Sequence, residues 1–162
     1  MRTFPKLWLG LSILLGFIWI YPIQTSFLRA FDGILAGPAT DFPQTIDQGI
    51  IPSFLWLWLC CIIALCWWML RTRSSRPLNN AEVRATQAFW WRITSLLVAI
   101  GLLFQFFFTV VTDYKIPFPG RMLLTFFVIL DVLLLFWLPT LLASPRSYRL
   151  VVPGAVRLFG GR

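Results

Sequence analysis

The most constraining feature of this sequence is a set of four apolar stretches, each long enough to cross a lipid bilayer as a helix. They cover approximately residues 7–23, 50–70, 89–111 and 122–143. A helix needs roughly 20 mainly apolar residues to cross a hydrocarbon layer ~30 Å thick, and it satisfies its own backbone hydrogen bonds there. The pattern predicts an all-α, polytopic membrane protein, with a bundle of four transmembrane helices forming a single membrane domain over residues 1–162.

Composition supports this fold class and narrows the chemistry. The chain is 59% hydrophobic and only 12% charged, which excludes both an ordinary soluble domain and a disordered chain. Its three cysteines all lie between residues 60 and 66, inside an apolar stretch, so we expect apolar packing rather than a disulfide framework. The absence of histidine removes the commonest zinc and haem ligand and the usual general base. We therefore expect no enzymatic activity, no cofactor and no metal.

The distribution of lysine and arginine predicts the orientation. The N-terminal tail, the second connection and the C-terminal tail carry ten basic residues: Arg2, Lys6, Arg71, Arg73, Arg76, Arg84, Arg146, Arg149, Arg157 and Arg162. The other two connections carry three: Arg29, Lys115 and Arg121. Basic residues stay on the cytoplasmic side, so both termini are predicted to be cytoplasmic, in a bacterial inner membrane. The net charge of +8 is accounted for in this way, and nucleic-acid binding is not expected.

Aromatic residues near the ends of the apolar stretches fit the same orientation. Those expected near the inner interface are Trp8, Trp67, Trp68, Trp90, Trp91 and Trp137, and those near the outer one are Trp19, Tyr21 and Tyr114.

Membrane lipids are the first predicted partners. The candidate contacts with anionic headgroups are Arg71, Arg73, Arg76, Arg146 and Arg149. The basic cytoplasmic tail, residues 144–162, alternates basic and apolar side chains and is expected to lie on the membrane surface. A topology signal without lipid recognition is the simpler interpretation of the arginines.

The first connection predicts a short amphipathic helix at the outer interface. Its apolar residues share one helical face: Phe27, Leu28, Phe31, Ile34 and Leu35. The first span is expected to end near Pro22, and no small-residue cleavage site follows it, so it is interpreted as an uncleaved anchor.

The other two connections predict how the third span begins and what lies beside it. Asn79, followed three residues later by Glu82, fits a capping box, which would start a helix of about thirty residues that continues into the third span. The proline-rich turn at 113–121 makes the third and fourth spans antiparallel neighbours. Small-residue pairs at i and i+4 are candidate helix contacts: Ser12 with Gly16, Cys60 with Ala64, and Ser95 with Ala99.

Asp131 is the most informative single residue. An ionised carboxylate at the centre of a bilayer costs ~2.5 kcal/mol or more, so it needs a compensating interaction. Its simplest predicted partner is Gln105 on the third span, through an interhelical hydrogen bond. Proton or cation passage, and pairing with a basic residue of another subunit, remain alternatives. Asp113 lies roughly 13 Å nearer the outer end, too far to form a catalytic pair with Asp131.

These features predict an accessory, assembly or structural subunit of a larger membrane complex, with other membrane subunits as partners. The alternative is a small oligomeric transporter or channel that uses Asp131 as a proton- or cation-responsive group.

Overall fold

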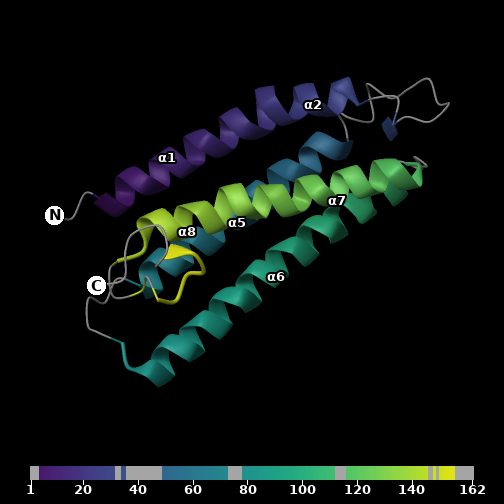
Figure 1. Cartoon of the computed structure of the whole chain (residues 1–162). Coiled ribbons are helices and arrows are strands. Elements are labelled where there is room, and N and C mark those ends of the chain that lie inside the picture. The colour runs from purple at the N-terminus through teal and green to yellow at the C-terminus, as the bar shows by residue number, and fades with distance from the viewer. Residues whose placement is uncertain are drawn as a thin grey trace.

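The computed structural model confirms an all-α bundle built from four long helical spans (Figure 1). It describes residues 4–31, 34–35, 49–72, 78–111, 116–145, 148 and 150–155. Within these ranges every regular element is a helix. The four helices long and apolar enough to cross a membrane are Leu9–Ala30, Ile51–Arg71, Asn80–Phe107 and Phe118–Ala143. The chain is a multi-pass membrane protein.

The first span is longer than predicted, because Pro22 does not end it. It consists of α1 (Phe4–Ile18), the π-helical segment η1 (Trp19–Gln24) and α2 (Thr25–Ala30), which form one continuous rod in Figure 1. Proline lacks an N–H group, and a local change to π geometry is one way in which a transmembrane helix accommodates it. The predicted short helix exists as α2, but it continues the first span instead of forming a separate element.

The second and third spans are single helices whose starts follow the local sequence. In α5 (Ile51–Arg71) a proline occupies the first turn, where an N–H group would have no helical partner. In α6 (Asn80–Val111) the Asn79 N–H group donates to Glu82 Oε2 at 3.0 Å. This bond is the Glu82 half of the predicted capping box, and Asn79 Oδ1 accepts from the Asn80 N–H group at 2.6 Å. The 32 residues of α6 confirm one long element.

The fourth span begins earlier than predicted and contains a second π-helical segment. It is formed by α7 (Phe118–Val132), η3 (Leu133–Trp137) and α8 (Leu138–Ala143). Proline near the start of α7 favours helix initiation, so part of the predicted turn belongs to the helix. Pro139 lies at the start of α8, directly after η3, and thus repeats the association of proline with π geometry.

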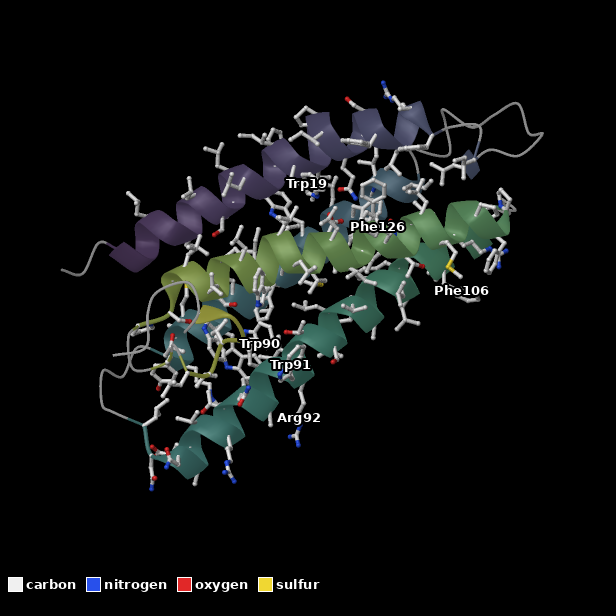
Figure 2. The ribbon with its side chains drawn as sticks, viewed as in Figure 1. Trp19, Trp90, Trp91, Arg92, Phe106 and Phe126 are labelled. Atoms are coloured by element: carbon white, nitrogen blue, oxygen red, sulfur yellow. The ribbon has the colours of Figure 1, made fainter. Side chains whose placement is uncertain are left out.

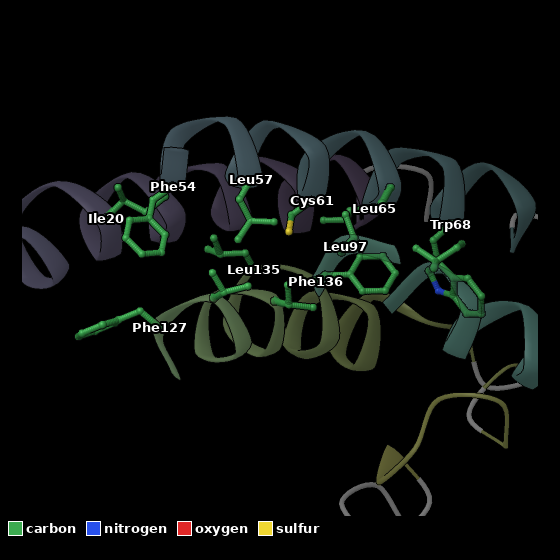
Figure 3. Packing of buried hydrophobic residues seen from close by; sticks show 14 of the residues in the cluster. Ile20, Phe54, Leu57, Cys61, Leu65, Trp68, Leu97, Phe127, Leu135 and Phe136 are labelled. Atoms are coloured by element: carbon green, nitrogen blue, oxygen red, sulfur yellow. The ribbon is translucent and has the colours of Figure 1, made fainter. Parts of the chain in front are cut away.

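The second and fourth spans form the centre of the bundle, with the first and third on either side. The first span contacts α5, η3 and α8, whereas α6 contacts α5 and α7. In Figure 3, Leu57, Cys61 and Leu65 of α5 face Leu135 and Phe136 of the fourth span. The third and fourth spans are neighbours, as the short connection predicts.

The described part of the C-terminal tail packs against the bundle. Val151, Val152 and Ala155 are buried, and the Trp137 indole Nε1 donates to the Pro153 carbonyl at 3.1 Å. Gly154 has a φ of +86°, a conformation that residues with a side chain rarely adopt, so the chain turns back toward Trp137 there. The tail was expected on the membrane surface, but these residues are part of the core because their apolar side chains complete it.

Candidate functional site

Asp131 lies at the centre of the bundle, near the end of α7, with no exposed surface. Its two carboxylate oxygens each accept a hydrogen bond from the first span. The Trp19 indole Nε1 donates to Oδ1 at 2.6 Å, and the Gln24 amide Nε2 donates to Oδ2 at 3.1 Å. These three side chains are here called the carboxylate site. Figure 2 places Trp19 between the first span and α7.

The π geometry of η1 explains how two residues five positions apart reach one carboxylate. In an α-helix, side chains five residues apart point about 140° away from each other. In a π-helix the hydrogen bonds join residues five apart, so Trp19 and Gln24 come onto one face. The segment that accommodates Pro22 therefore also assembles the carboxylate site.

The environment of the carboxylate site is otherwise apolar. The residues that follow Asp131 include the buried apolar side chains of Val132, Leu135 and Phe136. The buried Cys61 of α5 lies within electrostatic range of Asp131. The indole of Trp19 and the amide of Gln24, which donate to Asp131, are both uncharged groups. A carboxylate with no exposed surface in such a medium depends on its hydrogen bonds.

The predicted hydrogen bond between Gln105 and Asp131 is wrong. Gln105 Nε2 donates instead to the Leu124 carbonyl of α7 at 3.4 Å. Leu124 lies seven residues before Asp131, about 10 Å along the helix axis. Asp131 does form hydrogen bonds between helices, as expected, but its partners lie on the first span. Gln105 separately joins the third span to the fourth.

A second buried polar cluster lies at the end of the bundle where α6 begins. The Trp68 indole donates to Ser144 Oγ at 3.1 Å, and the Trp90 indole donates to Thr140 Oγ1 at 3.2 Å. These four residues are here called the tryptophan–hydroxyl cluster, and they join α5 and α6 to the end of the fourth span. Trp68 and Trp90 were expected at the membrane interface. They are each only 1% exposed, because they fill the core between helices.

Neighbouring tryptophans in the sequence do face outward, as interface residues should. Trp67 and Trp91 are exposed, and Trp67 packs edge-on against Phe89. The guanidinium of Arg71 lies 4.1 Å from the centre of the Phe89 ring, a cation–π contact. Arg71 is exposed, so it remains a candidate for headgroup contact. The other candidates, Arg73, Arg76, Arg146 and Arg149, lie outside the described residues.

The small-residue pairs differ in their outcome. Ser12 and Gly16 are buried, and Gly16 packs directly against the indole of Trp58 on α5. That pair is a helix contact, as predicted. Ser95 and Ala99 are exposed, so on α6 this spacing does not mark a contact with the described part of the bundle.

Comparisons with protein families, with curated proteins and with solved structures gave no match. Among the described residues there is also no group of three or more metal-ligating side chains.

Two site residues escaped the sequence analysis. The sequence predicts Trp19 at the outer interface and leaves Gln24 beyond the first span, because that span is expected to end near Pro22. A signal was present: an amide and an indole flank a proline inside an apolar stretch, at a spacing that only a π turn brings to one face. In the observed span, Leu9–Ala30, Trp19 lies near the middle, level with a buried carboxylate.

Proposed function

We propose that the protein is a non-enzymatic accessory, assembly or structural subunit of a larger complex in a bacterial inner membrane, with both termini in the cytoplasm. The observation that carries this proposal is the carboxylate site. The ionisable side chain in the middle of the fourth span is fully buried and uses both oxygens on donors of its own chain. Such a group holds the first and fourth spans together, a structural role.

The outer surface supports association with other membrane proteins. Trp56, Trp91 and Phe126 expose about half of their surface on the second, third and fourth spans (52%, 51% and 57%). Aromatic residues are enriched where membrane and protein partners meet a protein surface. The excess of basic residues in the two termini and the second connection supports the proposed orientation.

Native mass spectrometry of gently solubilised membranes tests this proposal. We expect the 18.7 kDa chain to leave the membrane with partner proteins at fixed stoichiometry. The Asp131→Asn variant should retain these partners, because asparagine preserves hydrogen bonding between the spans. A lone chain, or an oligomer of this chain only, would contradict the proposal.

A second candidate function, a small transporter or channel that responds to protons or cations, is favoured by one specific observation. Asp131 contacts one π-helical segment and lies two residues before another, and π segments inside helices are frequent at functional sites. In proteoliposomes, this function predicts a proton or cation flux that Asp131→Asn abolishes and Gln105→Met preserves. Equal flux in the Asp131→Asn variant would eliminate it.

A further inference from the structure

Gln24 holds a polar atom that the described residues leave without a partner. Its Nε2 atom donates to Asp131, but no described residue donates to its Oε1 atom, although the side chain is only 1% exposed. A buried acceptor without a donor destabilises the folded state. This atom belongs to the amide that already contacts Asp131, so its environment is tied to the state of that carboxyl group.

The two protonation states of Asp131 make opposite demands on this amide. An ionised carboxylate only accepts, so it requires the Nε2 atom of Gln24. A neutral carboxyl group carries one O–H donor and requires an acceptor in its place. Rotating the terminal amide of Gln24 by half a turn exchanges its two ends, and puts Oε1 where Nε2 now lies, 3.1 Å from Oδ2.

Counting hydrogen bonds favours neither protonation state. With an ionised Asp131, the Oε1 atom of Gln24 is without a partner. With a neutral Asp131 and a reversed amide, Nε2 takes that position instead. Trp19 donates to Oδ1 in both states, because an indole N–H can only donate. An apolar residue at position 24 would lack this symmetry, so Gln24 makes the carboxylate site usable in both forms.

We propose that the carboxylate site binds and releases one proton on Asp131 Oδ2, and that reversal of the Gln24 amide satisfies each protonation state. On uptake, a proton from water forms an O–H bond at Oδ2, and this O–H donates to Gln24 Oε1. On release the same bond breaks and the amide turns back. No electrons are transferred. This property goes beyond a subunit role, because it holds for the chain alone and within a complex.

The surroundings contain few other groups that could produce the same titration. On α5, the buried thiol of Cys61 lies within electrostatic range of Asp131. On the first span, Tyr21 and Arg29 are exposed on its outer side. On α7, Arg121 lies ten residues from Asp131, about 15 Å along the helix. The titratable residues of α6 lie in its first half, namely Glu82, Arg84 and Arg92, and η3 and α8 contain none.

Nitrogen-15 NMR of the full chain in lipid nanodiscs, with labelled tryptophan and glutamine, tests the proposal. Between about pH 4 and about pH 10, we expect the Trp19 indole and Gln24 amide signals to move with a common, single-proton midpoint. The Asp131→Asn variant should remove both movements, and Cys61→Ala should leave them. The Trp68 indole, which donates to a serine hydroxyl, is the internal control and should not move.

Two variants test the role of the amide separately. Trp19→Phe removes a group that can only donate, so the proton affinity of Asp131 should rise about tenfold, observed on the Gln24 signal. Gln24→Leu removes a partner of both states, so the affinity should change much less, observed on the Trp19 signal. Equal changes would overturn amide reversal. Trp19 and Gln24 signals that do not move, or that still titrate in Asp131→Asn, would overturn proton binding, whatever partners the chain has.

Discussion

The two buried polar clusters use the same donor, a tryptophan indole, against different acceptors. In the carboxylate site, the indole of Trp19 meets Asp131, whose acceptor strength depends on its ionisation. In the tryptophan–hydroxyl cluster, the indoles of Trp68 and Trp90 meet hydroxyl groups, which keep one state at all accessible pH values. The first cluster is thus sensitive to charge, whereas the second is a permanent contact between spans.

The clusters also differ in the backbone that supports them. Trp19 and Gln24 reach Asp131 from a π-helical turn, whereas Trp68 and Trp90 lie on regular α-helix and are almost fully buried. Regular helices with large buried side chains give a rigid core, whereas a π turn is a local departure from the preferred helical geometry. The comparison indicates that stability is concentrated in the tryptophan–hydroxyl cluster and adaptability in the carboxylate site.

The largest effect is expected at the tryptophan–hydroxyl cluster. Trp90→Ala removes a fully buried ring that stacks on Phe136, and it leaves Thr140 without its donor. We expect the free energy of unfolding to fall by about 3 to 5 kcal/mol, measured by denaturant titration in micelles. Trp91→Ala is the matched control, because Trp91 is exposed and only packs edge-on against Trp90. Equal losses in both variants would show that this core does not dominate stability.

The next largest effect is a difference between the two clusters in how the free energy of unfolding depends on pH. Above the titration midpoint of Asp131, Trp19→Phe removes a donor from a carboxylate, and we expect a loss of about 1.5 to 3 kcal/mol. Below the midpoint the loss should shrink, because a neutral carboxyl group is a weaker acceptor. Trp68→Phe should destabilise by the same amount at both pH values. Unfolding curves at two pH values measure this difference, and a pH-independent loss for Trp19→Phe would contradict it.

The smallest effect concerns how closely the first span approaches the second. A methyl group at position 16 would lie 2.7 Å from Cδ1 of Trp58, so Gly16→Ala forces that ring to move. Because Trp58 is only partly buried, the ring can shift, and we expect a loss of about 1 kcal/mol. Gly10→Ala is the control, since nothing lies within 4 Å of a methyl there. A Gly16→Ala variant as stable as Gly10→Ala would show that this contact is not tight.

Much of the fold follows from local sequence. The apolar length of the second, third and fourth spans predicts their positions, and the Asn79 and Glu82 spacing predicts the start of α6. Such features depend on hydrophobic transfer and on groups a few residues apart. The sequence predicts too late a start for α7, because Pro117, Pro119 and Gly120 are typical of a turn as well as of a helix start.

The candidate site was predicted only in part for a related reason. Asp131 was identified by the cost of burying a charge, which is a property of one residue. Its partners are not predicted correctly, because Gln105 is favoured only by its similar depth in the membrane on the third span. Depth does not say which face a side chain occupies, and Trp19 comes onto the face of Gln24 only through a π turn.

The sequence by itself determined that this chain has four stretches long enough to cross a membrane, that its basic residues are concentrated in the two termini and the second connection, and that one carboxyl group lies in the middle of a span. These follow from one-dimensional quantities: apolar length, charge order and the position of Asp131. Only the tertiary structure decided that Trp19 and Gln24 bind this carboxyl group, that Trp68 and Trp90 fill the core, and that the described tail residues close one end. Those outcomes depend on the rotation of each helix about its axis, which is set by packing against the others.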